Sequence, residues 1–148
     1  MVYQLDHQNR SIAKKIQQIQ QAAYRVEAEL IGFYKIPQLA ETIEEIQNST
    51  ETFLGYSEEQ LQGVISYKLE EDVVDIYRLV VDPIHFRKGV GKKLLNYLLK
   101  KQYACDFIVS TGSANKPAMA LYKWFGFQEG AVVEVAPGIY CIQLHLRK

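Results

Sequence analysis

The sequence predicts one domain over residues 1–148, of the α/β (α+β) class, with a mixed, mostly antiparallel sheet and helices on both faces. Three patterns support this prediction. Apolar residues recur at helical spacing in the first third of the chain, and runs rich in β-branched and aromatic residues follow after residue 51. A strand, a glycine-containing loop, a helix and a further strand come next, an order that makes the two strands parallel.

Two amphipathic helices are expected in the first third. Residues 12–23 place Ile and Ala on one helical face after a cap at Ser11, and residues 39–46 repeat the spacing after a proline. Residues 25–34 are charged at first and apolar later, and they contain Gly32, which favours the end of a helix. We therefore expect this segment to connect the two helices.

The later elements alternate between strands and helices. Antiparallel strands joined by short turns are expected at residues 52–56, 61–69 and 73–81. A helix with Leu on one face and Lys opposite is expected from residue 90, and its crossover makes the strand at 107–109 parallel to the strand at 73–81. A last helix and a hairpin are expected at residues 115–125, 127–135 and 139–146.

Composition limits the classes of partner. Lys plus Arg equals Asp plus Glu at 17 each, so no net field attracts nucleic acid or an anionic membrane, and we expect neither as a partner. No apolar run reaches the roughly 18 to 20 residues of a membrane helix, and the first residues lack the pattern of a signal peptide. A cytoplasmic protein is expected, and the sequence leaves a homodimer open.

Cysteine and histidine usage gives no sign of a metal. Cys105 and Cys141 lack metal-ligand or redox spacing and are expected to be reduced core residues. His7, His85 and His145 are scattered and share no ligand spacing. We therefore expect no metal site.

The loop after the strand at 73–81 has the composition of an anion site. Residues 84–95 bring two glycines and four basic residues to the start of a helix, where backbone N–H groups are unpaired and the dipole adds positive potential. The alternative is that Gly89 and Gly91 serve only a tight turn while the lysines solvate a helix face. The spacing fits neither a Walker loop nor a dinucleotide fingerprint.

Two sequence blocks resemble a known family. Residues 81–95 (VDPIHFRKGVGKKLL) are similar to the pyrophosphate-binding motif of the GNAT family of N-acetyltransferases, Q/R-x-x-G-x-G/A. Residues 115–127 (NKPAMALYKWFGF) resemble the family's second block, N-x-x-A-x-x-L-Y-x-x-x-G-F. One position departs from the first motif, because Phe86 stands where the family has Gln or Arg. Backbone N–H groups can still carry the cradle, with Arg87 as a substitute side chain.

The resemblance implies a GNAT-like acyl-CoA N-acyltransferase fold with acetyl-CoA as cosubstrate. It also implies that the strand end at 79–81 splays from its parallel neighbour near Phe107 and donates an N–H to the acyl carbonyl. An amine would attack the thioester directly in a ternary complex; a catalytically silent acyl-CoA binding or sensor module is the alternative. The implied cofactor-binding residues are Leu79, Val80, Val81, Arg87, Lys88, Gly89, Val90, Gly91, Lys92, Asn115 and Tyr122.

Two residues are candidates for proton transfer. The resemblance makes Tyr122 the general acid to the departing thiolate, against the alternative of a core tyrosine. Asp75 stands where some relatives carry a strand Glu as base, so it would act through a bridging water, unless it is a plain surface residue.

The acceptor is expected to be a small-molecule or peptide amine, cationic or neutral. Glu27 and Glu29 lie in the expected connection at 25–34 and would attract an ammonium group, although both could equally be solvated. Strand alternation predicts that Tyr77 shares a face with Asp75 and Leu79, and that the opposite face carries Ile76, Arg78 and Val80.

Overall fold

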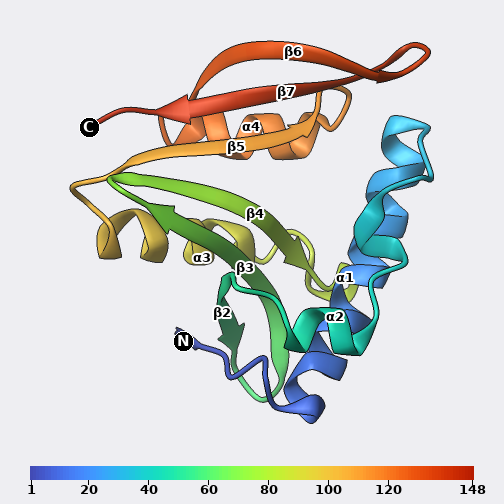
Figure 1. The fold of residues 1–148 in the computed structure, drawn as a ribbon, viewed down its shortest axis with the longest axis vertical. Helices are drawn as coiled ribbons and strands as arrows, with labels where there is room; N and C mark the ends of the chain where they lie inside the picture. The colour runs from blue at the N-terminus through green and yellow to red at the C-terminus, as the bar shows by residue number, and fades with distance from the viewer.

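The computed structural model describes all 148 residues as a seven-stranded sheet with helices on both faces (Figure 1). The strand order is β1-β2-β3-β4-β5-β7-β6, and every neighbouring pair is antiparallel except β4 and β5. The predicted mixed, mostly antiparallel sheet is therefore confirmed. The strands are β1 (Val2–Gln4), β2 (Thr52–Ser57), β3 (Leu61–Glu70), β4 (Val73–Val81), β5 (Asp106–Gly112), β6 (Gln128–Ala136) and β7 (Ile139–Leu146).

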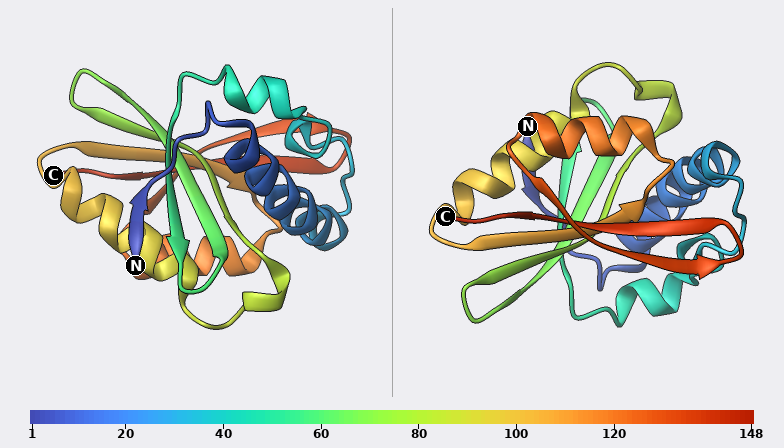
Figure 2. Two further views of the ribbon diagram at one scale, coloured as in Figure 1. Left: turned by 90° about the horizontal axis from the view of Figure 1, so that it is seen from below. Right: turned by 90° about the horizontal axis from the view of Figure 1, so that it is seen from above.

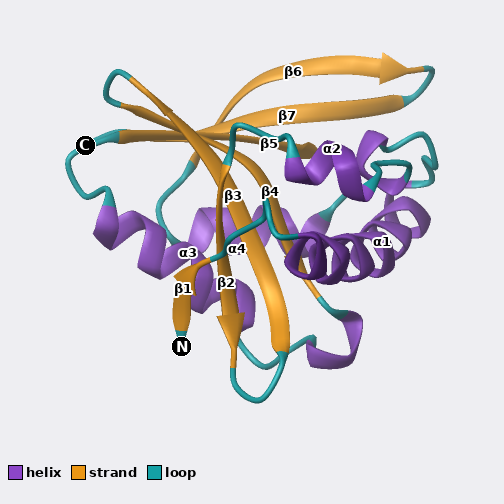
Figure 3. Cartoon of the chain, turned by 60° about the horizontal axis from the view of Figure 1, so that its bottom comes forward, coloured by secondary structure: helices purple, strands orange, loops and turns teal.

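Helices α1 and α2 cover one face of the sheet, and α3 and α4 cover the other (Figures 2 and 3). None of them combines the length and the apolar character that crossing a bilayer requires. The helices are α1 (Arg10–Ile31), α2 (Ile43–Gln47), α3 (Val90–Lys101) and α4 (Lys116–Trp124), and the 3₁₀ turns are η1 (Pro37–Leu39) and η2 (Pro83–His85).

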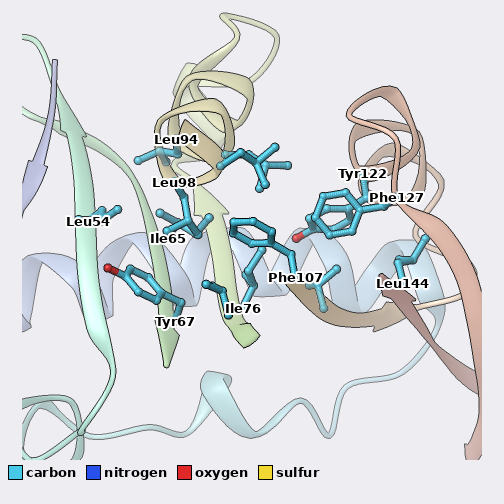
Figure 4. Close-up of a cluster of buried hydrophobic side chains, with 14 of the residues drawn as sticks. Leu54, Ile65, Tyr67, Ile76, Leu94, Leu98, Phe107, Tyr122, Phe127 and Leu144 are labelled. Carbon is cyan, nitrogen blue, oxygen red and sulfur yellow. The ribbon is translucent and has the colours of Figure 1, made fainter. Parts of the chain in front are cut away.

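The two faces carry separate apolar clusters. The larger, of 18 buried residues, lies between the sheet and α3 and α4 (Figure 4). The smaller, of eight, is built around Ile16 of α1, Ile46 of α2 and Phe53 of β2. Because both faces are buried, the central strands β3 and β4 alternate between two apolar layers.

The first helix is longer than predicted. It begins after Asn9, whose side chain accepts from the amides of Ser11 and Ile12, so Ser11 is not the cap. It ends at Gly32, with φ 70°. The expected connection at 25–34 is wrong as far as Ile31, because its Glu, Ala and Leu residues favour helix and outweigh the change in polarity. Glu27 and Glu29 therefore lie on a helix.

The second predicted helix is broken in two. Residues Pro37–Leu39 form η1, and α2 begins only after Thr42. Thr42 accepts from the amide of Glu45, whose carboxylate accepts from the Thr42 amide in return. This capping box begins α2 as a separate helix, so the helix predicted over residues 39–46 does not form as one element. Strand β1, which pairs with β2, has only three residues and was not predicted.

The parallel strands β4 and β5 separate before they end. They pair from Val73 with Asp106 to Ile76 with Val109, and no further. Beyond that point β4 stays paired only with β3, and β5 only with β7. The predicted splay is confirmed. Strand β5 is longer than the predicted 107–109, because the apolar pattern used for the prediction stops before Ser110 to Gly112, which are not apolar.

A bulge in β4 overturns the predicted alternation. Ile76 pairs with Tyr67 and Arg78 with Ser66, so Tyr77 has no partner on β3. After this extra residue the faces exchange, because side chains alternate one by one along a strand. Val74, Ile76, Leu79 and Val81 face the α3 and α4 side, whereas Arg78 and Val80 face α1 together with Asp75 and Tyr77.

Candidate active site

The loop between β4 and α3 presents unpaired backbone N–H groups. Gly89 has φ 77° and forms the N-cap of α3, with no side chain capping the helix. The Lys93 amide donates to the Gly89 carbonyl at 3.0 Å, and amides before it in the first helical turn have no earlier carbonyl to bond. The helix dipole adds partial positive charge at the same point. This arrangement suits a pyrophosphate.

The surroundings of the loop leave room for such a group. A Cβ added to Gly89 meets no atom within 4 Å, and one on Gly91 stands 3.5 Å from the Leu121 side chain. The side chains of Arg87 and Lys88 are exposed and form no ion pair. Both are therefore available to an anion at the loop.

The other predicted loop contacts are more restricted. Lys92 Nζ lies 4.4 Å from the ring centroid of Trp124, and Lys93 Nζ donates to Tyr56 Oη at 3.1 Å. Val90 is buried in the larger cluster, so only its backbone can reach a ligand. Phe86, at the position that departs from the motif, is 42% exposed and offers only an aromatic ring.

The splay gives β4 an open edge. From Arg78 to Val81 the strand has a partner only on its β3 side, and Tyr77 has none on either side. Every second residue of a strand directs its N–H and C=O to the same edge, so backbone groups between Leu79 and Val81 are unpaired there. This edge lies directly before the glycine loop in the chain, so a ligand held at the loop can extend along it.

Tyr122 brings a free hydroxyl to the interior. Its ring is 4% exposed and packs against Phe127 at 5.4 Å between centroids. The hydroxyl makes no hydrogen bond within the protein, and it points away from Phe127 and Leu144 (Figure 4). Burial and the charge of Glu27 raise the pKa of the phenol. The phenol is therefore protonated at neutral pH, as a proton donor must be.

Glu27 connects α1 with the start of α4. Asn115 Nδ2 donates to Glu27 Oε1 at 2.5 Å, while Asn115 Oδ1 caps α4 by accepting from the Ala118 amide at 3.2 Å. Burial raises the pKa of the Glu27 carboxyl, and the bond from Asn115 opposes the shift. Asn115, predicted to contact the cofactor, thus uses its side chain within the protein. Glu29 is exposed and, two residues on, points away from Glu27.

Asp75 does not lie beside Tyr122. It pairs with Ile108 in the part of β4 that is still joined to β5, before the strands separate. Partial burial and the charge of Glu70 raise the pKa of its carboxyl. Of the charges that act on Asp75, Glu70 and Lys68 belong to the end of the β3–β4 hairpin and Glu51 to the network around Arg78. Neither Asp75 nor Tyr122 acts on the pKa of the other, so the structure does not bring the two predicted catalytic residues together.

Sequence reasoning missed a buried ionic network beneath Tyr77. The guanidinium of Arg78 bonds Glu41 at 2.7 Å, Glu51 at 3.0 and 3.1 Å, Gln20 at 2.7 Å and Ser66 at 2.9 Å. Nothing in the sequence relates these residues, because they come from α1, the η1–α2 segment and three strand regions. The network ties α1 to the centre of the sheet.

A cavity of about 420 Å³ opens above this network. Tyr77, a predicted acceptor contact, is 41% exposed and forms part of its wall. The lining residues are Pro37, Gln38, Ala40, Glu41, Glu45, Glu51, Tyr77 and Arg78. The cavity lies on the α1 and α2 side of β4, and the other predicted acceptor contacts, Glu27 and Glu29, do not line it.

His85 and the other metal-binding residue types form no centre. His85 is 9% exposed, and neither of its ring nitrogens has a hydrogen-bond partner. No group of three or more His, Cys, Asp or Glu side chains is arranged to hold a metal ion. Cys105 and Cys141 are free thiols.

Sequence comparisons identify relatives of this chain. UPF0157 protein YqkA of Bacillus subtilis (strain 168) is 40% identical over 148 residues, which cover 99% of this chain and 43% of YqkA. The chain thus spans less than half the length of that relative. The ribosomal protein bS18 alanine N-acetyltransferase of Escherichia coli (strain K12) is 27% identical over 117 residues, covering 75% of this chain and 76% of that protein.

Solved structures share the fold at low identity. The ribosomal-protein-S18-alanine N-acetyltransferase from Escherichia coli gives a TM-score of 0.77 at 16% identity and covers 99% of this chain and 92% of its own. An aminoglycoside 6'-N-acetyltransferase complexed with coenzyme A gives 0.75 at 15% identity, with 99% and 96% covered. Both agree with the predicted GNAT-like fold.

The family itself follows from a match over most of the chain. A model described as the acetyltransferase (GNAT) family fits residues 13–127, which include both motif blocks. The match confirms the family resemblance that the two motif blocks predicted. The chain therefore belongs to the acetyltransferase (GNAT) family.

Proposed function

We propose that this protein transfers an acetyl group from acetyl-CoA to an amine by direct attack in a ternary complex. The observation that carries the proposal is the open edge of β4, which runs from Tyr77 to the unpaired amides at the start of α3. Relatives named as N-acetyltransferases of a ribosomal protein and of aminoglycosides support the reaction type. The free thiols of Cys105 and Cys141 fit a reducing, cytoplasmic setting.

Cofactor binding, stabilisation of the thioester carbonyl and proton donation would fall to different residues of this chain. Amides at residues 88–92 and the side chains of Arg87 and Lys88 hold the pyrophosphate of acetyl-CoA, which supplies the thioester. Amides on the open edge of β4, between Leu79 and Val81, donate to the thioester carbonyl oxygen as it gains negative charge. Tyr122 then gives its phenolic proton to the leaving sulfur.

The acceptor is proposed to be a small-molecule or peptide amine that approaches on the α1 and α2 side of the sheet. Tyr77 and the carboxylates that line the 420 Å³ cavity favour a neutral or cationic group there. A thiol-release assay with acetyl-CoA and a panel of amines tests the function. Release with at least one amine is expected. Binding of acetyl-CoA without release for any amine would identify a silent binding module instead.

We expect Gly89→Val to abolish acetyl-CoA binding while leaving the fold intact. The added side chain meets no protein atom, yet it would occupy the space above the loop amides and would disfavour φ 77°. Gly138→Val is a matched control, because Gly138 has φ 75°, has nothing within 4 Å, and lies in the β6–β7 turn. Calorimetry should show parental affinity for the control. Parental affinity in Gly89→Val would place the cradle elsewhere.

A further inference from the structure

Helix α1 brings a carboxylate with one free oxygen to the region of Tyr122. Glu27 Oε1 accepts from Asn115, but Oε2 has no hydrogen-bond partner. The hydroxyls of Tyr122 and Tyr24 likewise bond nothing in the protein, and the charge of Glu27 raises the pKa of both phenols. The charge of Glu27 thus acts on both phenols, and no hydrogen bond joins any two of the three groups. A bound group with N–H donors would supply the hydrogen bonds that these oxygens lack within the protein.

We propose that Glu27 is the general base of the reaction, taking through Oε2 the proton that the attacking amine loses. The inference rests on the proposed acetyltransferase function. It replaces Asp75 in this role, since Asp75 lies in the paired part of β4, among the charges of the β3–β4 hairpin.

The proton transfers balance with Glu27 and Tyr122 as a pair. A cationic acceptor first loses one proton to water; the neutral amine nitrogen then forms a bond to the thioester carbon, and one of its remaining protons passes to Glu27 Oε2. The carbon–sulfur bond breaks, and the phenolic proton of Tyr122 goes to the sulfur, so that free coenzyme A and an N-acetyl amide result. The proton on Glu27 then returns to the Tyr122 phenolate through water, and both residues regain their starting states.

The charges around Glu27 suit this role. The titratable groups whose pKa the Glu27 charge raises are Tyr24 on α1, Tyr122 on α4 and Cys141 on β7, and none is a cation at neutral pH. The buried guanidinium of Arg78 acts on the pKa of Tyr24 and is already paired with two carboxylates. Glu27 therefore has no counter-ion in the protein, and a cationic amine would provide one. Burial raises the pKa of its carboxyl, which strengthens it as a base.

Glu27→Gln tests the proposal. Glutamine keeps an oxygen that can accept from Asn115, so the bond between α1 and α4 is preserved, but the side chain cannot take up a proton. We expect kcat to fall by about 10²- to 10⁴-fold at unchanged acetyl-CoA affinity and melting temperature. The rate of the parent should fall as pH drops through the raised pKa of Glu27. That dependence should be missing in the variant.

Two controls separate the outcomes. Glu29→Gln changes an exposed carboxylate two residues away, and Asp75→Asn changes the other candidate base; both should keep parental kcat and pH dependence. Parental kinetics in Glu27→Gln would overturn the proposal and leave Glu27 as a residue that only positions α4. A parent protein that releases no thiol with any amine would overturn the acetyltransferase function itself, and with it this role.

Discussion

Tyr122→Phe is expected to lower kcat by about 10²- to 10⁴-fold, the usual contribution of a positioned general acid. The substitution removes only the hydroxyl, which makes no hydrogen bond within the protein, so the packing against Phe127 is retained. The loss falls on the chemical step and not on ground-state binding. Steady-state kinetics together with acetyl-CoA calorimetry would measure the two effects separately.

A second buried tyrosine supplies the control for this experiment. Tyr67 belongs to the same apolar cluster, is 5% exposed, and also makes no side-chain hydrogen bond (Figure 4). Tyr67→Phe should leave kcat at the parental value. If both variants turn over as the parent does, Tyr122 serves packing alone and the acid is another group or water.

Arg78→Met is expected to lower the free energy of unfolding by about 3 to 5 kcal/mol. Arg78 is 5% exposed, and its guanidinium is the shared partner of Glu41 and Glu51. Its removal therefore leaves two largely buried carboxylates without a cation. It also removes the bonds to Gln20 and Ser66. Urea denaturation of the parent and the variant would measure the difference.

An exposed ion pair provides the comparison. Arg10 bonds Glu44 at 2.9 Å, close to the distances in the Arg78 network, but both side chains are more than 60% exposed. Arg10→Met should therefore cost only about 0 to 1 kcal/mol. A loss for Arg78→Met as small as that of Arg10→Met would show that burial does not make this network important for stability.

The elements of the candidate site could be predicted because their signals are local. The two glycines at the start of α3 and the spacing from Asn115 to Gly126 depend only on neighbouring residues. The strand-helix-strand order that makes β4 and β5 parallel is equally local. Those signals were sufficient for the sheet order around the splay, for the helix starts at the loop and at Asn115, and for the family.

The predictions that failed concern features that depend on distant parts of the chain. The bulge at Tyr77 results from the pairing of β3 with the residues on either side of Tyr77, and no residue type in β4 predicts it. The partners of Arg78 lie 12 to 58 residues away along the chain. Glu27 was a candidate only for its charge, whereas its contact with Asn115, 88 residues later, is what relates it to Tyr122. Tertiary contacts decided all three.

The bulge at Tyr77 also means that β4 carries one residue more than its pairing with β3 requires. Deleting Tyr77 would restore simple alternation and keep its neighbours on their present faces, with Leu79 and Val81 toward α3 and Arg78 toward α1. Deleting one of the paired residues from Arg78 to Val81 would instead turn the residues on one side of the deletion to the opposite face. Folding should thus tolerate a one-residue deletion at Tyr77, as in turns such as the one at Gly138, where an added side chain meets no atom, but not at the paired positions that follow it.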